Sequence, residues 1–318
     1  MIYTVTVNPA LDYVMILKEM ETGQLNRSSR ELHYYGGKGI NISVVLNNLG
    51  IPSVCLGFVA GYVGEEIERG LNSRGCRTDF IHLEQGCTRI NVKLKEGGGR
   101  ETEINGNGPY VGAEYLEQMK EQVKRLKADD LLILSGNVQK EIPSDFYAQL
   151  AEIAVGRGMR FIADAEKSLL LPVLPFRPLL VKPNQKELEE MVGWKINSSS
   201  DLTEAADYLQ EQGARNVLVS RGPDGAYFQG EDGGRYFLDA PKGTVINTVG
   251  SGDSMVAGFL SKYLKGESLI KAACCGVAAG SARAFSEQLP EKDSVERFSS
   301  EIVFHEVKEV EKYAGNFE

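Results

Sequence analysis

Histidine and paired cysteine are scarce in this chain of 318 residues, and their scarcity excludes several kinds of site. The only histidines, His33, His82 and His305, lie far apart in the sequence and form no HExxH pattern. A histidine-rich metal site or a Ser-His-Asp triad is therefore poorly supported. The five cysteines include no CxxC pair, so we expect buried, reduced thiols of the kind found in cytoplasmic proteins.

Excess positive charge and long apolar segments are missing as well. The formal net charge is -9, which argues against general binding to nucleic acid or to a membrane surface. No apolar run reaches membrane-spanning length, and residues 1–7 alternate like a strand without the basic region of a signal peptide. We therefore expect a cytoplasmic protein that binds neither nucleic acid nor membranes. Binding of an anion would require local basic residues and a metal ion.

One glycine-rich segment directly precedes a helical pattern. Residues 247–254 read Asn-Thr-Val-Gly-Ser-Gly-Asp-Ser, and apolar residues at helical spacing follow. We expect Gly250 to Asp253 to form the first turn of a helix, where free N–H groups bind an anion beside an acid. Such a site suits a reaction that deprotonates a nucleophile next to a phosphate. On this segment alone, Ser251 or Asp253 could equally be a helix cap.

A second glycine-rich helix start reads Gly36-Gly37-Lys38-Gly39-Ile40-Asn41, and the helix after it ends at Gly50. This segment matches neither a Walker A loop nor GxGxxG. Lys38 could supply positive charge to a phosphate, and Asn41 could hydrogen-bond a hydroxyl. The alternative is a flexible turn with a solvated Lys38.

Strands and helices alternate regularly from Ala113 onward, which predicts an α/β fold with a doubly wound, mostly parallel sheet. Expected core strands are residues 2–7, 53–58, 131–134, 161–163, 179–181 and 216–220, and a hairpin is expected at 226–238. Polar residues follow several strands, namely Asp12, Ser135 to Asn137, Asp164, Asn184 and Gly222 to Gly225. Because strand ends of this kind share one edge of the sheet, these residues predict a single site there.

Residues 11–35 and 80–105 contain strand patterns with no helices between them. Strands 80–83, 89–94 and 101–104 are expected to form antiparallel pairs, with a glycine turn at 97–99. We expect a discontinuous lid of residues 11–35 and 86–105 over a core of 1–10, 36–85 and 106–318. Exposed lid edges favour a homodimer through the lid. The charged segment after Val307 is expected to be a surface helix.

Together these motifs resemble the ribokinase-like, or PfkB, family of carbohydrate kinases. The two glycine-rich segments look like its N- and C-terminal signatures. The segments Asn8-Pro9-Ala10-Leu11-Asp12, Lys182-Pro183-Asn184 and Ser220-Arg221-Gly222 occur in the family's order, so the resemblance covers essentially the whole chain. Lys38 and the Asn8 to Asp12 segment are most similar to members that act on ketose phosphates.

The resemblance implies a three-layer α/β/α ribokinase-like fold with a small β-sheet lid. It also implies ATP- and Mg²⁺-dependent phosphorylation of a ketohexose phosphate. Residues 89–93 and 101–106 favour conversion of D-fructose 1-phosphate to D-fructose 1,6-bisphosphate, and a tagatose-6-phosphate kinase is the alternative. A non-catalytic sensor of sugar phosphates or nucleotides is an alternative of another class, against which the retained Asp253 speaks. A dinucleotide dehydrogenase would need GxGxxG after the first strand, which is missing.

Site roles then follow from position in the family's motifs. Asp253 would be the catalytic base, and the amides of Gly250, Ser251 and Gly252 would stabilise the transferred phosphoryl group. Expected substrate ligands are Asp12, Gly36, Gly37, Asn41 and Asn137, with Lys38, Arg89 and Arg27 on the existing phosphate. Expected nucleotide ligands are Asn184, Ser220, Gly222, Gly225, Gly250 and Gly252. Asn184 and Glu187 would organise Mg²⁺ through water, although a helix-start acid is an equal interpretation of Glu187.

Two segments depart from the family pattern near the expected sugar. The chain reads Ser135-Gly-Asn-Val-Gln139 where similar kinases carry Ser-Gly-Ser-x-Pro. It reads Asp164-Ala-Glu-Lys167 where they carry Asp-Thr-Ser-Gly. An added acid at Glu166 disfavours a nearby phosphate unless the side chain points away, so the identity of the sugar stays open.

Overall fold

The computed structural model describes residues 1–307, and the surface helix expected after Val307 lies outside them. The strands are β1 (Ile2–Thr6), β2 (Ala10–Leu17), β3 (Arg30–Gly36), β4 (Ser53–Ala60), β5 (Arg77–Thr78), β6 (Ile81–Leu83), β7 (Arg89–Glu96), β8 (Glu101–Asn105), β9 (Leu131–Ser135), β10 (Arg160–Asp164), β11 (Leu180–Val181), β12 (Val217–Ser220), β13 (Ala226–Gln229), β14 (Arg235–Leu238) and β15 (Phe304–Glu306). The α-helices are α1 (Lys38–Asn48), α2 (Gly61–Ser73), α3 (Ala113–Lys124), α4 (Phe146–Gly156), α5 (Lys167–Leu170), α6 (Gln185–Val192), α7 (Ser199–Glu211), α8 (Ser251–Tyr263), α9 (Leu269–Ala284) and α10 (Lys292–Ser299). Short 3₁₀ helices η1 (Leu171–Phe176) and η2 (Gly222–Asp224) complete the set.

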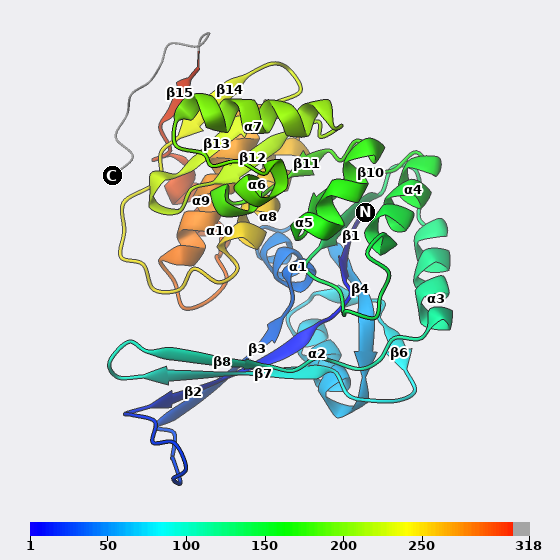
Figure 1. The fold of residues 1–318 in the computed structure, drawn as a ribbon, viewed down its shortest axis with the longest axis vertical. Coiled ribbons are helices and arrows are strands. Elements are labelled where there is room, and N and C mark those ends of the chain that lie inside the picture. The colour runs from blue at the N-terminus through cyan, green and yellow to red at the C-terminus, as the bar shows by residue number, and fades with distance from the viewer. Residues whose placement is uncertain (308–318) are drawn as a thin grey trace.

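A large, mostly parallel sheet forms the centre of the molecule (Figure 1). Its strand order is β15-β14-β13-β12-β11-β10-β9-β1-β4-β5, and β6 also pairs with β4. Pairing is parallel from β5 to β12 and antiparallel from β12 to β15. The expected doubly wound α/β architecture is thus confirmed.

Helices cover both faces of this sheet, because its strands are apolar on both sides. Leu132 and Leu134 of β9 pack on one face with buried residues of α3, α4, α6 and α7. Leu131 and Ile133 pack on the other face with residues of α1, α8 and α9. Alternate residues of one strand therefore enter two different cores, which gives the three-layer arrangement. Among residues 1–307, no helix combines the length and apolarity needed to span a bilayer.

The order of the strands reverses beside β1. The chain adds β4 on one side of β1, and later adds β9 to β12 on the other side. Loops at the carboxyl ends of parallel strands separate at such a point and leave a crevice. Helices α1 and α8, which pack against each other, both begin at this edge of the sheet.

A second sheet of four strands, in the order β3-β2-β7-β8, projects from the main body at the bottom of Figure 1. Strand β2 pairs antiparallel with β3 and parallel with β7, and β7 pairs antiparallel with β8. Strand β6, expected in an antiparallel pair, instead pairs parallel with β4 in the main sheet. The expectation was wrong because Ile81 and Leu83 are buried in the core, so β6 extends the main sheet.

Two further differences from the expected elements lie near the C-terminus. Helix α10 and the antiparallel edge strand β15 were not expected from the sequence.

All five cysteines are free, as expected, and four of them are buried while Cys87 is half-buried.

Candidate active site

A cavity of about 990 Å³ opens at the carboxyl edge of the main sheet, beside the second sheet. Most of the predicted site residues line it. These are Asp12, Gly37, Lys38, Asn41, Arg89, Asn137, Asn184, Glu187, Ser220, Gly222, Gly225, Gly250, Ser251, Gly252 and Asp253. Residues separated by more than 200 positions in the sequence are therefore brought to one cavity, as the shared strand edge predicted.

Gly36 and Arg27 are the predicted residues that do not line the cavity. Gly36 lies directly behind it, since a Cβ there would be 3.0 Å from Asp12 Oδ2. Arg27 is exposed in the loop between β2 and β3. The structure does not bring Arg27 to the cavity of its own chain.

The first glycine segment lets α1 begin against β1. Gly37 has φ 130°, and a Cβ on it would lie 2.5 Å from the Thr6 methyl carbon. The Thr6 hydroxyl accepts a hydrogen bond of 3.0 Å from the Ile40 N–H and so anchors the first turn. Lys38 and Asn41 consequently project from that turn toward the cavity.

The second glycine segment forms the start of α8 as predicted. Gly250 precedes the helix with φ 85°, and no side chain caps it. The alternative in which Ser251 or Asp253 is a cap is therefore excluded. The Ser251 N–H donates to the Thr248 carbonyl, whereas those of Gly250 and Gly252 have no hydrogen-bond partner within the described chain. These two amides are thus available to an anion, helped by the helix dipole.

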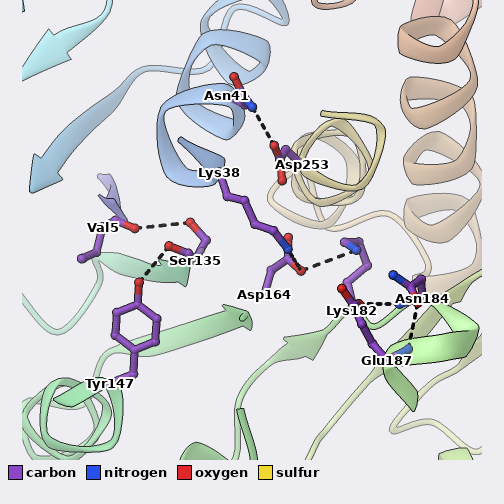
Figure 2. A network of polar contacts seen from close by, with 10 residues as sticks. All are labelled: Val5, Lys38, Asn41, Ser135, Tyr147, Asp164, Lys182, Asn184, Glu187 and Asp253. Carbon is purple, nitrogen blue, oxygen red and sulfur yellow. Dashed lines mark hydrogen bonds and ion pairs between the residues drawn. The ribbon is translucent and has the colours of Figure 1, made fainter. Parts of the chain in front are cut away.

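Asp253 sits in the first turn of α8 and is 5 % exposed. Its Oδ2 accepts a hydrogen bond of 2.8 Å from Asn41 Nδ2, which joins the two glycine segments (Figure 2). Burial, together with the charge of Asp164, raises the pKa of Asp253 to about 6. The pKa of this buried carboxyl thus lies close to neutrality, as a general base requires.

Beneath Asp253, one carboxylate links two lysines (Figure 2). Asp164 Oδ1 lies 3.2 Å from Lys38 Nζ and 3.5 Å from Lys182 Nζ. Burial acts to raise the pKa of Asp164, but the two ammonium groups outweigh it and lower that pKa. Burial acts to lower the pKa of Lys38, but Asp164, Asp253 and Glu187 together raise it. The Asp164 carboxylate and the Lys38 ammonium group are therefore charged at neutral pH.

The second sheet contributes an acid and a base to the other end of the cavity. Asp12 Oδ1 accepts a hydrogen bond of 2.8 Å from Asn91 Nδ2, and burial raises the pKa of Asp12. Arg89 donates to the Asn8 carbonyl at 3.1 Å and 3.3 Å, and burial lowers its pKa. No acidic side chain of the described chain pairs with Arg89, so its remaining donors suit an anionic ligand.

A model described as pfkB family carbohydrate kinase matches residues 5–291. The chain belongs to the pfkB family. It is a carbohydrate kinase, and the resemblance inferred from its motifs is confirmed.

The kinase is similar to relatives that are named for ketose phosphates. It is 41 % identical over 302 residues to the 1-phosphofructokinase of Bacillus subtilis, covering 95 % of this chain and 98 % of the relative. It is 34 % identical over 304 residues to the D-tagatose-1-phosphate kinase of Bacillus licheniformis, with coverage of 95 % and 98 %. The structure of phosphofructokinase-2 from Escherichia coli in complex with substrates and products matches with a TM-score of 0.89 and 28 % identity, covering 94 % of this chain and 98 % of that chain. The ribokinase-like fold is thus confirmed.

Asn184 and Glu187 of this kinase form a reciprocal helix cap. Asn184 Oδ1 accepts a hydrogen bond of 2.8 Å from the Glu187 N–H, and Glu187 Oε2 accepts one of 2.8 Å from the Asn184 N–H. The helix-start interpretation of Glu187 is therefore confirmed. Its role in organising Mg²⁺ stays a prediction.

Side chains of the described residues do not form a complete metal site, because no group of three or more His, Cys, Asp or Glu side chains could hold a metal ion. Glu187 lines the cavity and has one carboxylate oxygen, Oε1, that is not used by the cap. Mg²⁺ commonly keeps several waters and is held by one or two carboxylates plus substrate phosphates. The residues present fit that kind of ion, brought in with the nucleotide.

The two departures from the family pattern both face the kinase's cavity, since Asn137 and Glu166 are among its lining residues. Asn137 Oδ1 accepts a hydrogen bond from the Val138 N–H, which leaves its NH₂ group for a ligand. Glu166 is exposed and is paired with no basic side chain of the described chain. Because Glu166 lies at the cavity, the identity of the sugar is a question for substrate comparison.

Several lining residues were not predicted. Lys182 is part of the motif Lys182-Pro183-Asn184. Its position directly after the buried strand β11 was the sequence signal that could have identified it as a site residue. Thr6, at the end of β1, has no motif of its own. One wall is formed by the loop before α8 and by the last turns of α9, which no short pattern marks, namely Ala240, Pro241, Lys242, Gly243, Val245, Val277, Gly280, Ser281, Ala284 and Phe285.

Proposed function

We propose that the protein is an ATP- and Mg²⁺-dependent kinase of a ketohexose phosphate, with D-fructose 1-phosphate as substrate and D-fructose 1,6-bisphosphate as product. The observation that carries the proposal is the buried Asp253 directly behind two unoccupied N–H groups at the start of α8. The similarity to a 1-phosphofructokinase supports the choice of sugar.

Asp253 acts as the base in this proposal. It accepts the proton of the sugar hydroxyl while the hydroxyl oxygen forms a bond to the γ-phosphorus of ATP. The bond from that phosphorus to the bridging oxygen breaks at the same time, and ADP leaves with the electron pair. A pKa of about 6 leaves Asp253 ionised at neutral pH and still able to take the proton.

Electrostatic stabilisation of the transferred phosphoryl group comes from groups that are already in place. The N–H groups of Gly250 and Gly252 point from the start of α8, and the dipole of the helix adds positive charge. Lys38 and Lys182 add two ammonium groups beside the same loop. Preorganised charge of this kind supplies most of the catalysis in phosphoryl transfer.

The sugar lies toward the second sheet in this proposal. Asp12 and Asn41 hold its hydroxyl groups, and Arg89 holds its existing phosphate. Lys38 was expected on that phosphate too, but its bond to Asp164 favours the transferred group instead. Arg89, which pairs with no acidic side chain among residues 1–307, is then the main ligand of the substrate's phosphate.

The nucleotide occupies the other half of the cavity. Ser220, Gly222 and Gly225 lie along it, and Val245, Ala284 and Phe285 offer an apolar wall for the base. Mg²⁺, when bound with the nucleotide, would neutralise charge on the phosphates. Asn184 and Glu187 would hold its water ligands.

Phosphorylation of a tagatose phosphate is the second candidate, favoured by the similarity to a D-tagatose-1-phosphate kinase and by the unusual Asn137 and Glu166. ADP release should be measured with ATP and Mg²⁺ on fructose 1-phosphate, tagatose 1-phosphate, tagatose 6-phosphate, fructose 6-phosphate and fructose. We expect the highest kcat/KM on fructose 1-phosphate. A preference for a tagatose phosphate would replace the substrate and keep the mechanism. No turnover with any ketose phosphate, but binding of nucleotide, would support the sensor instead.

A further inference from the structure

Asp164 differs from an ordinary buried ion-pair residue in how its two oxygens are used. It ends β10, and its side chain is 2 % exposed. One oxygen, Oδ1, meets both Lys38 from the first turn of α1 and Lys182 from the segment after β11. The other, Oδ2, is buried without a hydrogen-bond partner within the described residues. The carboxylate is thus oriented by its two lysines alone.

Asp130 provides a comparison inside the same chain. It is also buried and also pairs with an ammonium group, that of Met1, at 2.8 Å. Its second oxygen accepts a hydrogen bond of 2.8 Å from the Lys127 N–H, so both of its oxygens are satisfied. A structural acid is expected to be satisfied in this way, because an unpaired buried oxygen costs stability. Asp164 does not meet that expectation.

The two lysines that Asp164 joins converge on the start of α8. A Cβ added to Gly252 would lie 2.8 Å from Lys182 Nζ, so that ammonium group is against the glycine turn. The charge of Asp253, the residue after Gly252, acts on Lys38 and favours its ammonium form. Two like charges so close repel each other strongly in a buried site unless an anion lies between them. Before a phosphate arrives, Asp164 is the carboxylate that contacts both ammonium groups and so offsets this repulsion.

We infer that Asp164 is a positioning residue for phosphoryl transfer, which holds the ammonium groups of Lys38 and Lys182 together beside the glycine turn of α8. The inference rests on the proposed kinase function of the same cavity. The transferred phosphoryl group then meets two fixed positive charges rather than two mobile ones. Asp164 itself touches neither substrate and acts through the lysines.

The test is the effect of Asp164→Asn on the two kinetic parameters. We expect kcat to fall about 10²-fold, the size found for loss of one preorganised donor. We expect KM for fructose 1-phosphate to change less than threefold, because Arg89 and Asp12 are untouched. Asp130→Asn is the matched control, since it removes a buried carboxylate of the same kind far from the cavity, and it should leave kcat unchanged.

A double-mutant cycle separates positioning from a general loss of structure. If Asp164 acts through Lys38, then Lys38→Met costs much less in the Asp164→Asn background than in the wild type. The same holds for Lys182→Met. Additive losses would overturn the inference. So would wild-type positions of both ammonium groups in a crystal structure of Asp164→Asn, a result that does not depend on activity.

The pH profile gives a further readout that a purely structural role would not move. Asp253 is faced by Asp164, Lys38, Lys182 and, from α9, Arg283. Burial and Asp164 raise the pKa of Asp253, whereas Lys38 and Lys182 lower it. If the lysines stay in place in Asp164→Asn, the acidic limb of the rate should move to lower pH, and if they are displaced, their loss opposes that shift. A limb that moves clearly to lower pH would therefore contradict the inference. If the wild type phosphorylates no ketose phosphate, the proposed function fails, and the crystal structure alone decides the role of Asp164.

If Asp164→Asn does not fold, the lysines provide the same test. Lys38→Met and Lys182→Met should be strongly non-additive in combination, because each lysine depends on the shared carboxylate. Additive losses in that pair would overturn the inference as well.

Discussion

At the scale of one residue, the buried carboxylate of Asp253 is the group whose properties lead to the most direct tests. Asp253 is nearly inaccessible, yet the proposed reaction requires it to be ionised. Burial and Asp164 favour the neutral form, while Lys38, the Asn41 hydrogen bond and Lys182 favour the charged form. The resulting pKa of about 6 is a balance that substitutions of its neighbours should shift in known directions.

Activity should therefore fall in acid as Asp253 takes up its proton. We expect kcat/KM to decrease about tenfold per pH unit well below pH 6. Asn41→Leu removes a hydrogen bond to the charged form, so the pKa of Asp253 rises and the acidic limb moves to higher pH. Both enzymes are assayed with the same sugar phosphate, so the substrate titrates identically in the two profiles. A difference between their acidic limbs therefore comes from a group of the protein.

Asn47→Leu is the control for that shift. Asn47 lies on the same helix, and its side chain donates to the Arg74 carbonyl, away from the cavity. Its replacement should leave the limb where it is in the wild type. Superimposable limbs for Asn41→Leu and the wild type would refute the role assigned to the Asn41 hydrogen bond.

The same raised pKa predicts that Asp253→Asn stabilises the fold. Asp253 has a pKa of about 6 in the folded state and an ordinary, lower pKa when unfolded, so its charge destabilises the fold above pH 6. The amide removes that charge, and the free energy of unfolding should rise by roughly 1–3 kcal/mol at pH 7.5. The gain should shrink as pH falls from 6 toward 4, where both states of the wild type are protonated. Urea unfolding at pH 7.5 and pH 4.5 measures it, and an equal gain at both would be inconsistent with the shift.

At the scale of the element, glycine at position 252 in the first turn of α8 meets a chemical requirement rather than a conformational one. Gly252 lies inside the helix with ordinary dihedral angles, so the backbone does not require glycine there. What requires it is the Lys182 ammonium group, 2.8 Å from where a Cβ would be. Stability and function should therefore respond differently to substitution of this residue.

Gly252→Ala should lower kcat about 10-fold to 10²-fold with little loss of stability. Alanine is favoured over glycine in a helix by about 0.5–1 kcal/mol, which offsets the displacement of a flexible lysine end. The displaced ammonium group no longer supports the transferred phosphoryl group. Gly156→Ala in α4 is the control, because open space surrounds Gly156, and it should keep full activity. A Gly252→Ala enzyme with wild-type kcat would show that Lys182 does not act there.

The sequence predicted those elements whose signals come from neighbouring residues, and it did not predict contacts between residues far apart in the chain. Both glycine segments and the strands ending at Ser135 and Asp164 were predicted, because helical spacing and buried apolar runs are local signals. The pairing of β6 was not, because a three-residue strand pairs with whichever edge its buried side chains reach. The contact between Lys38 and Asp164 spans 126 positions and had no local signal at all.

At the scale of the whole molecule, the second sheet is the least covered part of the structure. It contacts α2 near its base, while β7 and β8 extend beyond any helix of the described chain (Figure 1). Apolar side chains remain exposed here, with Ile104 of β8 at 59 % and Leu25, in the loop between β2 and β3, at 80 %. Sheet surfaces of this kind are usually buried by a partner or by a second copy.

We therefore predict a homodimer formed through the second sheet. Closure of the sheet over the sugar would also exclude water from the transferred group. Light scattering coupled to gel filtration should give the mass of a dimer at micromolar concentration. Ile104→Lys places a charge on β8 and should shift the protein toward the monomer, because a buried unpaired charge opposes association.

Val155→Lys is the matched control for that variant. Val155 is 45 % exposed on α4, a helix that lies away from the second sheet in Figure 1, and the same substitution there should leave the mass unchanged. Because β7 also carries Arg89 at its first residue, loss of the dimer should raise KM for the sugar phosphate more than it lowers kcat. Two results would contradict the dimer prediction: a monomeric wild type, or a dimer that persists in Ile104→Lys. The second sheet would then act only as a lid, and its apolar side chains would contact substrate or solvent rather than another copy.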